Sequence, residues 1–440
     1  MKNLLSAGAI AVAMLSVSAG AQAQSSDELA EIRSQLRSLM QRVDKLEQEN
    51  TTLSAENATL KTQAESLKAD TQGLRKDAAT AAADVAKVKA ADWTSRIAFK
   101  GDLRYRYEFT SDETTTAAGV QAVADRYRDR LRARLVMDAK VADDLTVGLG
   151  IASGENGDPR SSNQTLTGVF NRKAFDLDLA YFDWKFASFG NLIVGKMKQP
   201  FFKPSQSVYF DADVNPEGVA VALNRGRWFG SAYGYFVNEI SGAENTRTAD
   251  TMLYGGQVGY KLPLGKSNLT LAAMYYDLAA GKGRAPFFAG NANGNTVVGG
   301  VLLNDYRVLD LAAEYTTTLG SWPLLVWADL AQNQAPDDLD EAFSGGVIIG
   351  KASNPGSFEF GIGYYSVEAD AVFAQVFESD FANGVTDTDG LVLRAGYALQ
   401  RNWTLNATYF LNDRNMDVPN MAGATDVDFD RLQLDLNLKF

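Results

Sequence analysis

Residues 429–440 read FDRLQLDLNLKF. In this stretch the apolar side chains Leu432, Leu434, Leu436, Leu438 and Phe440 alternate with the polar side chains Arg431, Gln433, Asp435, Asn437 and Lys439. Because successive side chains on a strand point to opposite faces, the segment predicts a strand with one apolar and one polar face. A tilted strand of about 9–11 residues spans the hydrocarbon of a membrane. The segment is therefore typical of a strand with lipid on one side and water on the other.

The same period-two pattern continues over most of the chain. It predicts sixteen strands, over residues 96–110, 128–141, 144–153, 174–186, 191–201, 218–224, 228–239, 250–263, 267–279, 305–319, 323–333, 341–353, 357–371, 389–400, 402–412 and 429–440. We therefore predict an all-β transmembrane barrel of about sixteen antiparallel strands over residues 91–440. The alternative is a soluble sandwich or propeller, whose strands are nearer five or six residues long.

Short and long connections alternate between these strands. The long ones are 111–127, 154–173, 202–217, 240–249, 280–304, 334–340, 372–388 and 413–428. Outer-membrane barrels have short periplasmic turns and long external loops. Since the first connection is long and the strand number even, both ends of the barrel are expected on the short-turn, periplasmic side.

The first 23 residues have the pattern of a secretory signal peptide. Lys2 precedes an apolar run from Leu4 to Val17, and the sequence Ala21-Gln22-Ala23 follows it. The apolar run is shorter than the roughly 20 residues that a membrane-spanning helix needs. We therefore expect residues 1–23 to be removed after export.

Residues 24–90 carry a heptad repeat. With Ile32 at position d, the d positions continue as Leu39, Leu46, Leu53, Leu60, Leu67, Leu74, Ala81 and Val88. A 3.5-residue repeat of this length predicts a periplasmic coiled coil, the alternative being a lone amphipathic helix packed on the barrel. Asn50 and Asn57 occupy consecutive a positions, where a polar residue fixes register at a cost in stability. They are compatible with a dimer or a trimer.

The composition excludes several classes of chemistry. The chain has no Cys and no His, so disulfides, thiol catalysis and Ser-His hydrolysis are excluded. Its net charge of −12 argues against a nucleic-acid partner. Residues 150–158 and 380–389 are acid-rich, but the second only superficially resembles a Ca²⁺ loop, because the regular acidic spacing and the terminal Glu are missing. The alternative is a divalent ion bound by a loop or bridging to lipopolysaccharide. We expect no enzymatic activity, no cofactor and no metal.

Alternation also assigns the two faces of the predicted barrel wall. It places Leu177, Leu179 and Tyr181 on the lipid face. A Lys or Arg facing lipid at mid-depth costs about 2–4 kcal/mol, so the charged faces must line the lumen. The basic residues so placed are Arg104, Arg106, Arg128, Arg130, Arg132, Arg134, Lys196 and Lys198. They form either a ladder that attracts anions or a wall neutralised by Asp102, Glu108, Asp176 and Asp178.

The chain resembles the putative porins of Gram-negative bacteria. The resemblance rests on the signal peptide, the heptads and the segments RIAFKGDLRYRYEF (96–109), RDRLRARL (128–135), LIVGKMKQPFF (192–202) and FDRLQLDLNLKF. It implies an outer-membrane channel through which small hydrophilic solutes or ions diffuse passively. It also implies that Phe440 is a signal for the barrel assembly machinery. The alternative function is an envelope tether, in which the coiled coil binds peptidoglycan or another periplasmic partner.

The resemblance further implies partners and a constriction. Outer-membrane lipids and lipopolysaccharide are expected around the barrel, which is expected to form a homo-oligomer, with a trimer favoured over a dimer. In general porins the third long loop folds inward and narrows the lumen, and here that loop is residues 202–217. We expect Lys203, Tyr209, Asp211 and Asp213 at the constriction, with the two carboxylates facing the basic wall. The alternative is a surface loop in which Asp and Asn serve turns.

Overall fold

The computed structural model describes residues 26–91, 93–115, 121–155, 157–241, 250–419 and 423–440. The predicted signal peptide, residues 1–23, lies outside the described residues. The described chain forms two compact units, an N-terminal helix and a β-barrel, which divide at residues 92 and 93.

The N-terminal unit is a single helix, α1 (Ser26–Ala91). The predicted d-position leucines are all exposed along it, with exposed fractions between 56 % at Leu53 and 70 % at Leu74. The coiled coil stays a prediction, because its partner helices would be other copies of the chain. None of the helices in the described part of the chain is long and apolar enough to cross a membrane.

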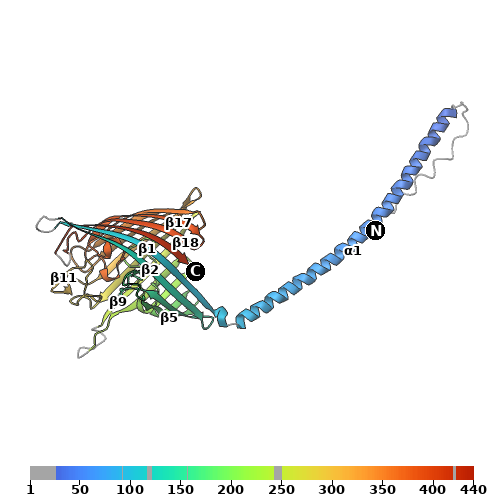
Figure 1. Ribbon diagram of the computed structural model, residues 1–440. Helices are drawn as coiled ribbons and strands as arrows, with labels where there is room; N and C mark the ends of the chain where they lie inside the picture. The colour runs from blue at the N-terminus through green and yellow to red at the C-terminus, as the bar shows by residue number, and fades with distance from the viewer. Residues whose placement is uncertain (1–25, 92, 116–120, 156, 242–249, 420–422) are drawn as a thin grey trace. The chain divides into compact units, whose positions relative to one another are not determined.

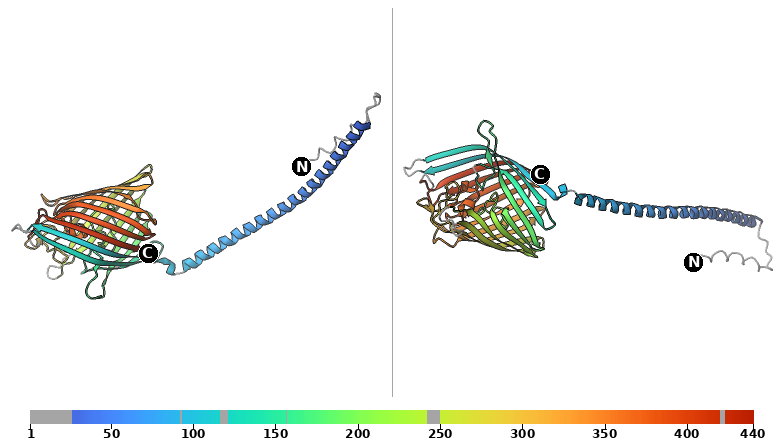
Figure 2. Two further views of the ribbon diagram at one scale, coloured as in Figure 1. Left: turned by 45° about the horizontal axis from the view of Figure 1, so that its top comes forward. Right: turned by 90° about the horizontal axis from the view of Figure 1, so that it is seen from below.

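The second unit is a closed antiparallel barrel of sixteen long strands (Figures 1 and 2), and it confirms the predicted fold. A short helical turn, η1 (Trp93–Arg96), precedes it. The long strands are β1 (Ile97–Thr115), β2 (Gln121–Lys140), β3 (Leu145–Ser153), β5 (Phe175–Ala187), β6 (Gly190–Lys196), β7 (Glu217–Arg225), β8 (Trp228–Asn238), β9 (Thr251–Leu264), β10 (Ser267–Ala279), β13 (Arg307–Leu319), β14 (Trp322–Asn333), β15 (Glu341–Gly350), β16 (Phe358–Val367), β17 (Thr388–Gln400), β18 (Trp403–Arg414) and β19 (Val427–Lys439). Pairing of β1 with β19 closes the sheet.

Smaller elements lie in the connections. They are β4 (Gln164–Thr165), which pairs with β2, the two-stranded ribbon of β11 (Val297–Val298) and β12 (Val301–Leu302), and the helical turns η2 (Ala374–Val376) and η3 (Phe381–Asn383).

The period-two pattern is the physical cause of the barrel wall. In β19, Leu434 and Leu438 are exposed, whereas Arg431 and Gln433 are buried inside the barrel. Two-residue turns join several strand pairs at one end, and Gly226, Gly265, Gly320 and Asn402 take positive φ in them. The C-terminus lies at this end, opposite the β11 ribbon (Figure 1).

Two details of the prediction are wrong. Residues 111–127 are mostly strand, because β1 and β2 continue pairing as far as Thr115 and Gln121. A register shift between β3 and β5 skips one residue at Asp178 and reverses the alternation after it. Leu179 is therefore buried inside the barrel and the Tyr181 hydroxyl donates to Asp138, so neither residue faces lipid.

Candidate functional site: the barrel interior

The β6–β7 loop, residues 197–216, folds into the barrel and reaches two distant parts of its wall. The Tyr209 hydroxyl donates to the carbonyl of Asp329 on β14 at 2.9 Å. The Asp213 carboxylate pairs with Arg134 on β2, also at 2.9 Å. Since β2 and β14 are far apart in the strand order, the loop crosses the interior.

The β16–β17 loop, residues 368–387, also folds inward, which the sequence analysis missed. Phe373, Phe377 and Phe381 are almost completely buried. Two backbone hydrogen bonds join this loop to the β6–β7 loop: the amide of Asp211 donates to the carbonyl of Val376, and that of Glu378 to the carbonyl of Val208. The phenylalanines recur every fourth residue within a long connection, and that spacing was the available signal.

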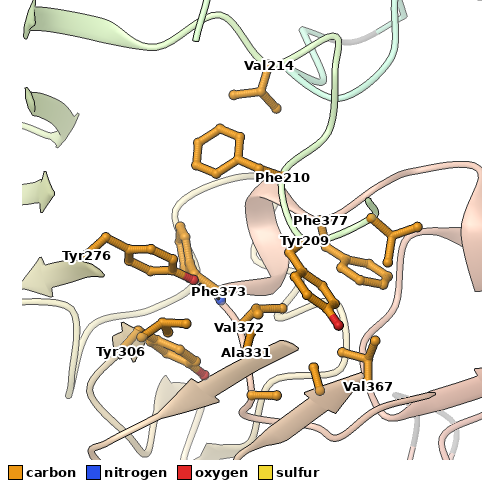
Figure 3. Close-up of a cluster of buried hydrophobic side chains, with 14 of the residues drawn as sticks. Tyr209, Phe210, Val214, Tyr276, Tyr306, Ala331, Val367, Val372, Phe373 and Phe377 are labelled. Atoms are coloured by element: carbon orange, nitrogen blue, oxygen red, sulfur yellow. Dashed lines mark hydrogen bonds between the residues drawn. The ribbon is translucent and has the colours of Figure 1, made fainter. Parts of the chain in front are cut away.

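The two loops build an apolar core against one side of the barrel. Figure 3 shows Tyr209 and Phe210 of the first loop gathered with Phe373 and Phe377 of the second. The wall strands contribute Tyr233, Tyr235, Tyr276, Val308, Trp327 and Tyr365 to the same cluster, and Tyr306 joins it from the connection before β13. The charged faces expected from the sequence lie on other strands; on this side aromatic residues occupy the inward positions, so the interior is not polar all round.

The opposite side carries the predicted arginines, packed into an ion-pair network. Asp102 accepts hydrogen bonds from Arg132 at 2.9 Å and from Arg134 at 2.7 Å. Glu108, completely buried, pairs with Arg128 and Arg130. These two carboxylates are the ones expected from the sequence.

Further carboxylates complete the network at the seam between β1 and β19. Arg106 binds Asp435 through two hydrogen bonds, of 2.7 and 2.8 Å, and donates to Asp380 of the β16–β17 loop at 2.7 Å. Arg104 lies 3.8 Å from Asp435, and Arg431 lies 3.5 Å from Asp380. Asp213, which pairs with Arg134, also belongs to this network. The network thus joins seven guanidinium groups to five carboxylates: Arg104, Arg106, Arg128, Arg130, Arg132, Arg134 and Arg431 with Asp102, Glu108, Asp213, Asp380 and Asp435.

The other predicted neutralising acids form no direct ion pair with the arginines, although Asp178 interacts electrostatically with Arg134 and Lys198. Among the ion pairs of the described residues, none involves Asp176 or Asp178, and Asp178 accepts a hydrogen bond from Asn215. Asp380, Asp435 and Asp213 take that place, and the sequence did not single out the first two because their partners are distant in the chain. Burial opposes ionisation of Asp380, but Arg106 and Arg431 hold the pKa of this loop carboxyl far below its usual range.

The predicted lysines are less closely integrated into this network. Lys196 pairs with Glu217 on the neighbouring strand at 2.9 Å. Lys198, at the start of the β6–β7 loop, is exposed. The Lys203 ammonium donates to the carbonyl of Phe210 within its own loop.

The two loop aspartates have different surroundings. Asp213 contacts the basic wall directly, and although burial opposes it, Arg132 and Arg134 hold its pKa below the usual range. Asp211 instead accepts hydrogen bonds from the amides of Ser379 and Asp213. Burial and the nearby Glu378 raise the pKa of Asp211 well above its ordinary value. The expectation that both carboxylates face the basic wall therefore holds for Asp213 and is wrong for Asp211.

A cavity of about 570 Å³ opens among the loops beside the charged wall. Its lining includes Arg128, Arg130, Arg160, Arg431, Asp380 and Asn163. Charged and amide groups thus surround the cavity, whereas the apolar loop core fills the opposite side of the barrel.

The family model described as putative porin matches residues 110–298 and 302–440. The chain belongs to the putative porin family. This confirms the resemblance found in the sequence. The porin is an outer-membrane channel of the porin type, and its family and fold indicate a channel rather than an enzyme.

Among solved structures, the porin is similar to OprB of Pseudomonas putida at high pH, with a TM-score of 0.51 and 14 % identity over 78 % of this chain and 94 % of that one. At this identity the likeness supports the barrel fold alone. Weaker matches are the trimer form of OmpT of Vibrio cholerae (TM-score 0.45, 14 % identity, 78 % and 99 % covered) and Salmonella typhi OmpF with daunomycin (0.46, 13 %, 78 % and 97 %). No curated protein sequence matches the porin.

Proposed function

We propose that the porin lets small hydrophilic solutes or ions diffuse passively along the charged side of its barrel. The supporting observation is the network of seven guanidinium groups and five carboxylates on β1, β2, β19 and the two inward loops. Charged groups keep a passage wet, whereas the apolar core on the other side excludes water. The eight predicted basic residues are proposed as pore-lining, and Lys203, Tyr209, Asp211 and Asp213 as parts of the constriction loop.

The surplus of arginines supports a modest preference for anions. Asp102 and Asp213 neutralise Arg132 and Arg134, so the surplus lies in the part of the network nearer the β1–β19 seam. Single-channel recording of the purified protein tests both proposals. We expect discrete conductance steps and a reversal potential of anion-selective sign in a salt gradient. Absence of steps in correctly folded protein would contradict the channel, whereas cation selectivity would contradict only the anion preference.

We further propose that α1 forms a parallel homo-oligomeric coiled coil in the periplasm. In a parallel, in-register assembly each g residue faces the e residue five positions later in the neighbouring helix. The pairs Arg42–Glu47, Glu56–Lys61 and Asp70–Arg75 then join opposite charges, and none of the pairs between Gln35 and Arg75 joins like charges. Asn50 and Asn57 would form matched polar layers that fix this register.

The second candidate function is an envelope tether, favoured by the length of α1 and its exposed apolar positions. The helix would then bind peptidoglycan or another periplasmic partner, with the barrel as its anchor. Liposome swelling with residues 24–90 deleted separates the two functions. Retained permeability supports the channel, and a closed barrel together with a detached envelope supports the tether.

A further inference from the structure

Two buried carboxylates lie on neighbouring strands beneath the β6–β7 loop, away from the arginine network. Asp310 on β13 is 7 % exposed, and Asp329 on β14 is completely buried. The register pairs Asp310 with Ala331 and Asp329 with Ala312, so the two carboxylates are diagonal neighbours on the inward face. Within the described residues, no Lys or Arg forms an ion pair with either carboxylate.

The polar atoms around these carboxylates lack partners. Both carboxylate oxygens of Asp329 and the hydroxyl of Ser344 are buried without a hydrogen bond. Ser344 is completely buried and lies directly opposite Asp329 in the pairing of β14 with β15, so it belongs to the same inward face. The Tyr233 hydroxyl, also without a partner, is within electrostatic range of Asp310.

Positive charge is scarce in this region. The Lys203 ammonium interacts electrostatically with Asp329, but it is shared with Glu378, Asp211 and Asp213. An uncompensated buried carboxylate is strongly unfavourable, and a protein avoids it by protonation or by binding a cation. The Asp310 and Asp329 side chains approach each other and the Ser207 hydroxyl approaches Asp329, so their oxygen atoms converge as the ligands of a hard cation do.

We propose that Asp310 and Asp329 hold a divalent cation, Ca²⁺, together with the hydroxyl groups of Ser344 and Ser207. The Ser207 side chain lies beside Asp329 and comes from the β6–β7 loop. The two carboxylates and two hydroxyls offer six oxygen atoms, the lower end of the number that Ca²⁺ takes. Two carboxylates also balance its charge. No cluster of three or more acidic, His or Cys ligands occurs in the described residues, so hydroxyl oxygens must complete the set.

The site would pin the β6–β7 loop to the barrel wall. Ser207 and Tyr209 belong to this loop, and the Tyr209 hydroxyl already binds the backbone of Asp329. The ion would add a second attachment of the loop at the same point of β14. This inference concerns binding and stability, so it stands whether or not the proposed solute diffusion is correct.

The test uses the full chain, refolded in detergent without lipopolysaccharide and stripped with a chelator. Bound Ca²⁺ is measured by equilibrium dialysis, and the thermal midpoint is measured with and without Ca²⁺. We expect wild type to bind one ion that is lost, or bound about tenfold or more weakly, in Asp310→Asn/Asp329→Asn, since both charged ligands are gone. The midpoint of wild type should rise with Ca²⁺ and that of the double variant should not.

The matched control is Asp337→Asn/Asp338→Asn, which removes two exposed carboxylates from the β14–β15 connection. It should bind Ca²⁺ as wild type does. Equal Ca²⁺ binding by all three proteins would overturn the proposal. A wild-type thermal midpoint that is unchanged by Ca²⁺ and falls only with rising pH would also overturn it, because that behaviour indicates a proton shared by the two carboxylates. If the double variant does not fold, Ser344→Ala replaces it and should bind Ca²⁺ more weakly than wild type. The wild-type midpoint should then fall when chelator is added. Unchanged binding in Ser344→Ala together with an unchanged midpoint would overturn the proposal.

Discussion

Gly101 and Phe440 form the closing contact of the barrel. Each backbone amide donates to the carbonyl of the other residue, at 3.0 Å in both directions. The ring of Phe440 lies over Gly101, so that a Cβ atom on residue 101 would come within 2.4 Å of it. The final aromatic of the chain therefore fits a site that only glycine leaves open on the first strand.

A side chain at position 101 should weaken closure. In Gly101→Val the added carbon would also lie 2.6 Å from the carbonyl oxygen of Arg134, a backbone atom that cannot move freely. We expect a loss of about 1–3 kcal/mol, typical of overpacking, measured from denaturant unfolding of the folded barrel. Ala98→Val, at an exposed position of the same strand, is the control and should change little. Phe440→Ala should keep the backbone bonds and lower mainly the yield of assembled barrel.

The ion pair of Asp213 with Arg134 should hold the β6–β7 loop against β2. We expect Asp213→Asn to give a larger and noisier single-channel conductance, because the loop loses its charged contact with the wall. Asp211→Asn should alter ion selectivity less than Asp213→Asn does, since Asp211 faces the β16–β17 loop. If both variants conduct like wild type, the loop does not form the constriction.

The β16–β17 loop should limit the open area of the pore through its buried phenylalanines. Phe377→Ala leaves a cavity in the loop core, and such truncations cost about 3–5 kcal/mol. We expect a higher conductance in planar bilayers with the barrel still folded. Phe360→Ala, on an exposed outward position of β16, serves as the control and should leave conductance unchanged. An unchanged conductance in Phe377→Ala would mean that this loop does not restrict flow.

The contact between the two loops should weaken as pH rises. Burial and the charge of Asp380 raise the pKa of Glu378 to about 7, from an ordinary value of 4.5. The proton therefore stabilises the folded loop fully below about pH 4.5, and this contribution is lost as pH rises through about 7. We expect faster protease cleavage of the loop and a larger conductance at about pH 8 than at about pH 5.

Glu378→Gln should flatten this pH dependence, and Glu239→Gln, at an exposed position, should not. Some pH dependence of cleavage and conductance is expected to remain in Glu378→Gln, since burial raises the pKa of Asp387 in the same loop to about 6. If cleavage and conductance depend on pH as strongly in Glu378→Gln as in wild type, a group other than Glu378 causes the pH dependence.

The charge pairs of the proposed coiled coil can be tested by exchanging the two charges of one pair. Lys61→Glu should place like charges at the Glu56–Lys61 pair, destabilise the coiled coil by about 0.2–1 kcal/mol per pair and so lower its melting midpoint. Adding Glu56→Lys should restore it. Both are read by circular dichroism of the full chain, with the oligomer mass measured alongside. An antiparallel or monomeric helix would show no such restoration.

The sequence predicted the wall of the barrel well, because strand periodicity is a local property. Alternation in residues 429–440 is sufficient to place Arg431 inside and Leu434 outside. The one failure in β5 comes from the bulge at Asp178, which depends on how β3 pairs and leaves no mark on the alternation itself. The steric requirement for glycine at position 101 likewise follows only from its contact with Phe440 in the folded barrel.

The sequence by itself therefore determined the strands, their number and which faces carry charged residues, as well as a helix with a heptad repeat. Only the tertiary structure decided which side of the interior is charged and which is apolar. That choice depends on two loops that fold inward and bring Asp213 to Arg134 and Asp380 to Arg106. These contacts join residues far apart in the chain, and their stability comes from burial and charge pairing that no local pattern encodes.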